Sequence, residues 1–466
     1  MNRLILLFSV VFLFLGTTIF AQNQDTTLML TLKQAQDYAL KNSPVIKNAN
    51  LDLESAKKKV WETTAMGLPQ VNSKLAYSYM LTVPASIKSF SGLSNLSPWM
   101  YGADQALRGI TGNPQFGNIP APAPQEPTNE NDMKWGLTYD ITATQLLFSG
   151  AYIVGLQTAK TFKSLSEINI TKSQNDLNES ITNAYFMNLV VNENLRVIDS
   201  IYKNTETILY EITQLNQKGF IDVTDVDQLT LTLANLKNTK EMLARQCEIA
   251  ANLLKFQLGV SLTSKIEFAD KLDVITQLVN VETLSKSEFK VENYSDYKML
   301  ETQERMMGLN VKLQKSTFLP DIAAYYMHDE NFNDKSFSFT PPNSVGLSVS
   351  IPLFGSGMKL AKVSQAKIGL EKMKNTKYQA SLGLQLDFET SRSAYITAIS
   401  KYSTNKQSVE LANRIYNKSI IKQKEGIISS LELTQAQTQY LQAQSNLFTS
   451  IIELSSAYSK LEKMLK

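Results

Sequence analysis

The residue types that most often catalyse reactions or bind metals are scarce in this chain. Its 466 residues include one histidine, His328, and one cysteine, Cys247. Zinc sites use several His or Cys ligands, and a Ser-His-Asp triad needs an imidazole between its two partners. One cysteine cannot form an internal disulfide either. We therefore predict a protein that is not an enzyme and has no cofactor, with His328 exposed in a loop and Cys247 packed as a small apolar residue.

Two acidic residues, Asp225 and Glu432, follow glycines at the start of helical patterns. Gly219 comes shortly before the first acid and Gly426 shortly before the second. Such glycines often end the preceding helix in a left-handed turn. An acid in the first turn of the next helix interacts favourably with the helix dipole. A structural role at the helix start and a functional role at the turn are therefore both open for these acids.

The two turns belong to a duplicated chain. Residues 42–70 align without gaps with residues 293–321. The other matched features are the Leu-Pro steps Leu68-Pro69 and Leu319-Pro320, the Leu-Phe steps Leu147-Phe148 and Leu353-Phe354, and the glycines Gly219 and Gly426. We therefore predict two structural repeats over residues 22–258 and 291–466, joined by a linker over residues 259–290.

Each repeat contains a pair of segments in which apolar and polar residues alternate. The alternation predicts strands at about residues 69–82 and 133–148, and again at about residues 320–328 and 344–354. Alternation over about ten residues, with aromatic residues among the apolar set, is typical of transmembrane barrel strands. A half-buried sheet in a globular protein gives the same pattern. In a barrel, Lys74 and Asp140 of the polar set would face the lumen.

Long helices follow each pair of strands. Residues 128–319 and 353–466 contain no proline, and their apolar residues recur in alternating steps of four and three, as in coiled coils. The predicted helices cover residues 150–217, 223–258, 357–424 and 429–466. The first of these would be on the order of 100 Å long at ~1.5 Å per residue. The fold class is therefore mainly α with a small β part, built from long coiled-coil-like hairpins.

The membrane interpretation requires several copies of the chain. After the N-terminal segment no apolar run reaches the roughly 18 residues of a helical span. Four strands cannot close a barrel, and an open sheet edge in lipid leaves backbone groups without partners. We therefore expect copies of the chain to share one barrel.

The N-terminus and one insertion are predicted to lie outside this scaffold. Residues 1–21 have the basic start, apolar core and small final residue of a cleavable signal peptide. The residue directly after the predicted cleavage position is Gln22 and the one cysteine, Cys247, is far from it, so no lipoprotein is expected. The insertion over residues 81–134 holds seven prolines and five glycines, which predicts a flexible extracellular loop. In the alternative, it covers the mouth or binds a partner through Phe90, Trp99 and Tyr101.

With these features together, the chain resembles the TolC-like outer-membrane factors, the outer membrane efflux protein family. The resemblance rests on the duplication, the Leu-Pro and Leu-Phe steps, and the turn sequences GFIDVTDVDQLTLTLANL from Gly219 and GIISSLELTQAQTQYLQAQ from Gly426. It implies a homotrimer with a twelve-stranded barrel in outer-membrane lipid of a Gram-negative-type cell and a helical tunnel in the periplasm. It also implies two partners, a periplasmic adaptor (membrane fusion) protein and an inner-membrane transporter. The formal charge of +3 suggests no nucleic-acid partner.

The resemblance further implies a gate at the helix turns. Thr224, Asp225 and Glu432 match gate positions of the family. The family's Tyr and Arg positions read Gln423 and Ile428 here, so we expect hydrogen bonds and apolar contact at Ile428 in place of an Arg-linked latch. The remaining expected site residues are Gly219, Val226, Gly426 and Leu433 at the turns and adaptor contact, and Pro69 and Pro320 at the strand starts.

The function that follows is passive conduction. We expect an exit duct of a tripartite efflux or type I secretion system, supplied by the inner-membrane transporter. The alternative is a periplasmic coiled-coil adaptor or scaffold, which would share the helical period. An adaptor is expected to have one main hairpin and lipoyl-like domains, without two alternating strand pairs.

Overall fold

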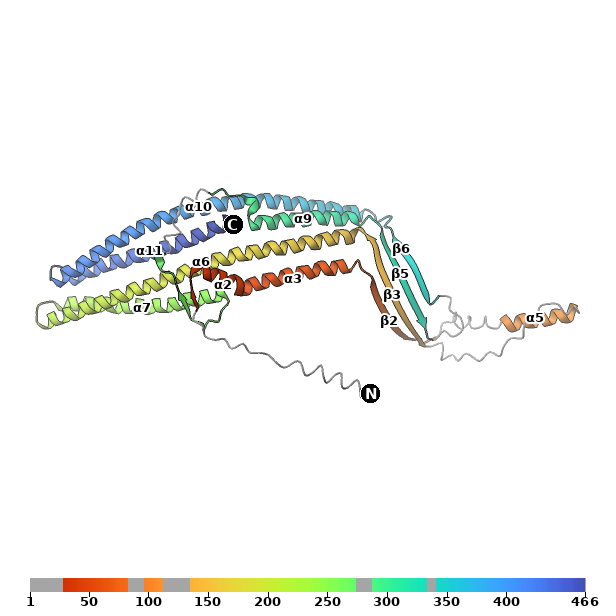
Figure 1. Ribbon diagram of the computed structural model, residues 1–466, viewed down its shortest axis with the longest axis horizontal. Coiled ribbons are helices and arrows are strands. Elements are labelled where there is room, and N and C mark those ends of the chain that lie inside the picture. The colour runs from red at the N-terminus through yellow and green to blue at the C-terminus, as the bar shows by residue number, and fades with distance from the viewer. Residues whose placement is uncertain (1–27, 83–95, 112–134, 274–286, 333–340, 466) are drawn as a thin grey trace, which may run out of the picture. The chain divides into compact units, whose positions relative to one another are not determined.

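The computed structural model describes residues 28–82, 96–111, 135–273, 287–332 and 341–465 (Figure 1). The predicted signal peptide lies outside these residues, as do Phe90 and much of the insertion. The chain divides into two compact units. The first comprises Met1–Ala56, Phe162–Arg305 and Glu371–Lys466, and the second comprises Lys57–Thr161 and Met306–Leu370.

The fold is mainly helical, which confirms the predicted class. The α-helices are α2 (Leu32–Asn42), α3 (Pro44–Ala65), α5 (Leu96–Thr111), α6 (Gly150–Gln217), α7 (Val223–Leu258), α9 (Ser295–Ser316), α10 (Met358–Lys424) and α11 (Ser430–Leu465). The strands are β1 (Leu28–Leu30), β2 (Gln70–Tyr79), β3 (Trp135–Ser149), β4 (Ile266–Phe268), β5 (Asp321–Asn331) and β6 (Asn343–Ser350). The elements α3, β2, β3, α6 and α7, with α5 between the two strands, correspond in order to α9, β5, β6, α10 and α11, and β4 lies between the two sets.

The core of the first unit follows the step of four and three residues along the long helices. On α6 the buried stripe contains Leu177, Ile181, Ala184, Asn188, Val191, Ile198, Thr205 and Ile212. On α7 it contains Leu229, Leu236, Leu243, Ala250 and Leu254. A straight helix repeats every 3.6 residues, so a stripe with a 3.5-residue period remains in contact with a partner only if the helices wind around each other.

A small parallel sheet of β1 and β4 packs on the same core. The hydroxyl of Tyr185 on α6 donates to the carbonyl oxygen of Leu30 and to Oδ2 of Asp270, each at 2.9 Å. Asp270 also accepts from the backbone nitrogen of Leu32 at 2.8 Å. The part of the linker that contains Asp270 is thereby fixed to α6. Burial, followed by the hydrogen bond to Asp270, raises the pKa of Tyr185 well above its usual value.

The second unit contains a four-stranded antiparallel sheet in the order β2-β3-β5-β6 (Figure 1). The register between β3 and β5 shifts between Leu146 and Phe148. Within the described residues, β2 and β6 each pair with a single strand, so they form the two edges. Pro69 directly precedes β2, and Pro320 directly precedes β5.

Three features differ from the sequence-based expectation. His328, expected in an exposed loop, is half-buried within β5, where its Nδ1 lies 2.8 Å from Oδ1 of Asn343, because β5 extends beyond the expected strand end. The fourth strand ends at Ser350, whereas the alternation continues to residue 354. Pro352 explains the early end, because proline has no N–H to donate to a sheet. The expected flexible loop over residues 81–134 contains the helix α5. Among the described residues, none of the helices has the length and apolar character needed to cross a membrane.

Candidate functional site

The two helical turns have the same construction. Gly219 has a φ of 80° and Gly426 a φ of 70°, both in the left-handed region. After the first glycine, the backbone nitrogen of Phe220 donates to the carbonyl oxygen of Leu215 at 3.0 Å. After the second, the backbone nitrogen of Ile427 donates to the carbonyl oxygen of Lys422 at 2.8 Å. In each turn, a carbonyl oxygen near the end of the helix thereby gains a hydrogen-bond donor. The left-handed glycine makes this turn possible, which is the structural role expected for it.

The helix after the first turn is capped by Asp222, a residue that the sequence analysis did not single out. Oδ1 of Asp222 accepts from the backbone nitrogen of Thr224 at 2.8 Å and from its hydroxyl at 2.7 Å. These hydrogen bonds lower the pKa of Asp222. Because Asp222 fills the N-cap position of α7, Asp225 is free for another contact.

Asp225 connects the two turns of one chain. Its Oδ1 accepts from the backbone nitrogen of Ser430, the first residue of α11, at 2.9 Å. Ser430 is fully buried, and its hydroxyl lies 3.5 Å from Nε2 of Gln423, which is also buried. The carboxylate of the first turn thus satisfies one of the free N–H groups at the start of the other hairpin's second helix. This contact joins positions 205 residues apart in the sequence.

An apolar cluster fills the space between the turns, and we call it the tip cluster. Its buried members are Ile208, Ile212, Leu229, Tyr416 and Leu433, and its half-buried members include Val226, Ile428 and Tyr440. The rings of Tyr416 and Tyr440 stack at 5.6 Å between centroids. Burial of a leucine such as Leu229 contributes about 1.5–3 kcal/mol. Burial also raises the pKa of Tyr416 to about 12.

The residues expected at the turns and the adaptor contact differ in their exposure to solvent. Leu433 is buried and Val226 and Ile428 are half-buried, so these side chains support the tip cluster from within the chain. Glu432 is exposed. Four apolar side chains near the turns are also exposed. They are Phe220, Val223, Ile427 and Leu431, at 76%, 57%, 69% and 54% exposed. The sequence analysis missed these four, although they are adjacent to the turn glycines or in the first turn of the following helix.

Most apolar side chains of the four-stranded sheet lie on one face and most polar side chains on the other. The exceptions are on β5, with His328 and Glu330 on the mainly apolar face and Tyr325 and Met327 on the mainly polar face. One face carries Val71, Leu75, Tyr77 and Tyr79 on β2, Trp135, Leu137, Tyr139 and Ile141 on β3, Tyr326 on β5, and Val345, Leu347 and Val349 on β6. Val71, Leu75 and Val345 are 68%, 66% and 80% exposed. The other face carries Asn72, Lys74, Thr138, Asp140, Thr142, Asp329, Ser344 and Ser348. Lys74 lies opposite Asp140, which lies opposite Asp329.

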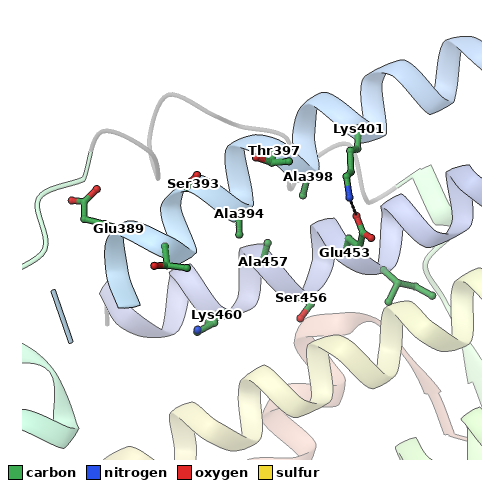
Figure 2. A pocket seen from close by; sticks show the side chains of 12 residues that line it. Glu389, Ser393, Ala394, Thr397, Ala398, Lys401, Glu453, Ser456, Ala457 and Lys460 are labelled. Carbon is green, nitrogen blue, oxygen red and sulfur yellow. Dashed lines mark hydrogen bonds and ion pairs between the residues drawn. The ribbon is translucent and has the colours of Figure 1, made fainter. Parts of the chain in front are cut away.

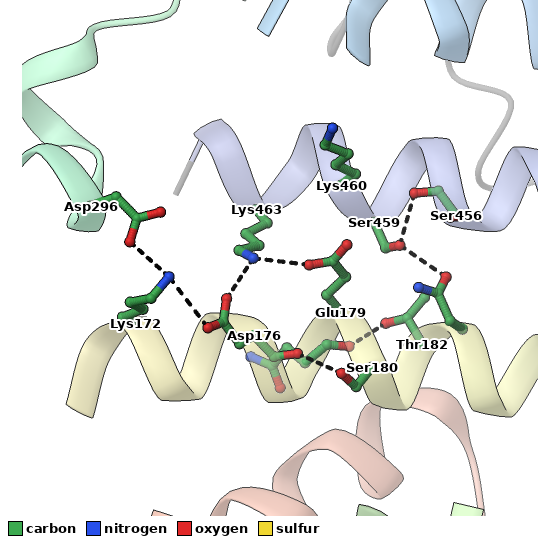
Figure 3. A network of polar contacts seen from close by, with 12 residues as sticks. Lys172, Asp176, Glu179, Ser180, Thr182, Asp296, Ser456, Ser459, Lys460 and Lys463 are labelled. Carbon is green, nitrogen blue, oxygen red and sulfur yellow. Dashed lines mark hydrogen bonds and ion pairs between the residues drawn. The ribbon is translucent and has the colours of Figure 1, made fainter. Parts of the chain in front are cut away.

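An ion-pair network connects three helices of the first unit (Figure 3). Nζ of Lys463 on α11 lies 2.5 Å from Asp176 and 3.1 Å from Glu179, both on α6. Lys172 extends the network from α6 to Asp296 on α9 at 2.7 Å. Burial disfavours the charged form of Lys463, but hydrogen bonds to the two acids outweigh it and raise its pKa. Sequence patterns did not reveal this network because its members lie on separate helices.

A groove between α10 and α11 offers no reactive arrangement (Figure 2). Ala394, Ala398 and Ala457 are among the residues that line it. Its acid Glu453 is paired with Lys401 at 2.9 Å, and its acid Glu389 with Arg392 at 2.5 Å. Paired, exposed carboxylates are not placed as general acids or bases. The described residues also contain no cluster of three or more His, Cys, Asp or Glu side chains that could hold a metal ion.

Comparisons with known proteins agree with this geometry. Residues 293–465 match the sequence profile of the family described as "Outer membrane efflux protein". A search of curated protein sequences gave no match. Among solved structures, CusC, described as forming a transmembrane channel, is 14% identical with a TM-score of 0.70, covering 96% of this chain and 95% of that one.

Two further structures share the fold. The outer membrane protein VceC of Vibrio cholerae is 12% identical with a TM-score of 0.66, covering 93% of this chain and 95% of that one. The outer membrane channel CmeC of Campylobacter jejuni is 14% identical with a TM-score of 0.68, covering 97% of this chain and 90% of that one. The chain thus shares its fold with these outer-membrane channel proteins, and its residues 293–465 match the outer membrane efflux protein family.

Proposed function

We propose that the chain is one protomer of a trimeric exit duct in the outer membrane. The duct conducts substrates passively, and the energy comes from an inner-membrane transporter that delivers them through a periplasmic adaptor. The family match and the shared fold support a channel rather than an enzyme. The observation that carries the proposal is the four-stranded sheet.

The two faces of this sheet fit two different environments. Val71, Leu75 and Val345 expose most of their apolar surface on one face, which is unfavourable in water and favourable in hydrocarbon. Lys74 and Asp140 lie on the opposite face, where they require water. A sheet between lipid and an aqueous lumen meets both needs at once.

The edges of the sheet explain why several copies are required. In hydrocarbon, each backbone N–H or C=O without a partner costs several kcal/mol. Pairing β6 of one copy with β2 of the next removes both edges when the sheet closes into a ring. Three copies, the number implied by the family, give twelve strands.

The proposal is tested by adding the purified protein to a planar lipid bilayer. We expect discrete conductance steps, because a closed ring of strands encloses water. Protein that remains a soluble monomer and produces no conductance would contradict the proposal.

We further propose that the two turns form the gate at the periplasmic end. The contact between Asp225 and Ser430 and the tip cluster hold the two hairpins of one chain together, in place of an Arg-linked latch. Asp225 and the exposed Glu432 supply negative charge at this end. Replacing them with Asn and Gln is expected to lower the cation selectivity of single channels, and unchanged selectivity and conductance would remove both residues from the gate.

The adaptor is proposed to contact the exposed apolar residues at the turns. Phe220 and Ile427 directly follow Gly219 and Gly426 and are exposed. Cross-linking of a cysteine introduced at Phe220 to a co-purified adaptor tests this contact. The alternative of a periplasmic adaptor or scaffold is disfavoured, since two strand pairs combine in one sheet.

A further inference from the structure

The helix α5 carries an apolar stripe that the proposed duct does not use. Trp99, Met100, Leu107 and Ile110 are 70%, 50%, 46% and 82% exposed. With 3.6 residues per turn, these four positions fall on one side of the helix together with the small residues Ala103 and Ala106. The opposite side carries polar residues such as Gln105. The helix is therefore strongly amphipathic, and its apolar side faces solvent.

The charge of α5 indicates which partner would cover this stripe. Asp104 and Arg108 are its only charged residues, and they form an ion pair with each other at 3.1 Å. The helix is thus electrically neutral and offers little attraction to a charged protein surface or to anionic headgroups. An apolar stripe that includes a tryptophan suits the boundary between water and hydrocarbon, where tryptophan side chains concentrate.

The boundary expected at one end of the sheet lies within reach of α5. β2 ends at Tyr79 and β3 begins at Trp135, and these two residues are register partners. Both connections to α5 therefore start from the same aromatic end of the sheet, where Tyr77 also lies on the apolar face. Aromatic side chains of barrel strands concentrate at the membrane–water interface. Residues 80–95 can span at most about 55 Å at ~3.4 Å per residue, a reach that allows α5 to lie at this interface.

We propose that α5 lies along the outer surface of the membrane, with the stripe of Trp99, Leu107 and Ile110 inserted among the lipids beside the barrel. The same lipid bilayer then covers the apolar face of the sheet and the apolar stripe of α5. α5 thereby lies beside the duct mouth and not across it. This inference rests on the proposed function, which places the sheet in the membrane.

The three tryptophans of the chain allow a direct test. Trp61 lies on α3, Trp99 on α5 and Trp135 at the start of β3. Full-length variants that retain one tryptophan each, with phenylalanine at the other two positions, are reconstituted into phosphatidylcholine vesicles brominated either near the headgroup or near the chain end. A helix at the interface lies about 5–10 Å deep, so we expect Trp99 to be quenched about twofold more by the shallow bromines. Trp135 is also expected to be quenched and Trp61 to be unaffected.

A pair of substitutions on α5 provides the matched control. In the variant that retains only Trp99, Ile110→Glu places a charge on the apolar stripe and is expected to abolish the quenching. Gln105→Glu places the same charge on the polar side and is expected to leave the quenching unchanged.

The possible failures are distinguishable. An unquenched Trp99 beside a quenched Trp135 overturns the inference and leaves the duct standing; blue-shifted emission would then indicate packing against a second copy, and red-shifted emission would indicate exposure to water. An unquenched Trp135 contradicts the proposed function itself, and the inference with it.

Discussion

A lysine at position 75 should prevent assembly, whereas a lysine at position 76 should be tolerated. Leu75 lies near the middle of β2 on the apolar face, and Ala76 lies next to it on the polar face. Leu75 is 66% exposed in the single chain, so in water Leu75→Lys would cost little. At the centre of a membrane the same change costs about 2–4 kcal/mol. A trimer carries three such lysines, so the cost of the assembled ring is on the order of 6–12 kcal/mol.

The assay is the amount of heat-modifiable trimer in outer-membrane fractions on an unheated denaturing gel. Leu75→Lys is expected to remove most of the trimer, and Ala76→Lys to leave an amount near that of the unmodified protein. The two variants place the same lysine and the same charge on the same strand, on opposite faces of the sheet; the residue replaced is a leucine in one and an alanine in the other. Equal amounts of trimer in the two variants would refute the assignment of one face to lipid and the other to water.

Three other predictions address the helical part. Asp225→Ala removes the acceptor for the Ser430 backbone nitrogen and should raise the single-channel conductance. Asp227 is an exposed acid in the same helical turn, and Asp227→Ala should leave the conductance unchanged. Equal conductance in the two variants would argue against a role of the Asp225–Ser430 hydrogen bond in closing the channel. Lys463→Met leaves the half-buried Glu179 without its ion-pair partner and leaves Asp176 with Lys172 alone at 3.5 Å, and it should cost about 1–3 kcal/mol in the free energy of unfolding, seen as a lower Tm. Lys460→Met breaks an exposed pair and should cost about 0–1 kcal/mol. Burial raises the pKa of Tyr416 to about 12, above its usual value near 10. The stability that the neutral Tyr416 contributes is therefore complete below pH 10 and is lost as the pH rises to 12. Tyr416→Phe should show a smaller fall in Tm between pH 10 and pH 12 than the unmodified protein.

The helical class could be predicted from periodicity because each long helix repeats its apolar stripe many times. Absence of proline and a 3.5-residue period both favour long helices, and the stripe from Leu177 to Ile212 is the one that becomes buried. The strands could likewise be predicted from the alternation of apolar and polar residues. The fourth predicted strand was too long, because Pro352 has no N–H to donate and the pairing ends at Ser350. Local patterns therefore indicated local structure well.

Contacts between distant segments could not be predicted in this way. Asp225 could be identified as a first-turn acid, but its bond to Ser430 depends on how two hairpins meet. The ion pair of Lys463 and Asp176 depends on the same kind of packing. The helix α5 was missed for a different reason, since the prolines and glycines around it concealed the amphipathic period of its own residues.

The number of chains in the complex extracted from the outer membrane is the most direct measure of the central claim. Native mass spectrometry in mild detergent should give a single species of three identical copies, because the proposed ring closes by pairing β6 of each copy with β2 of the next. A monomer as the sole species, with both sheet edges still open, would contradict the account.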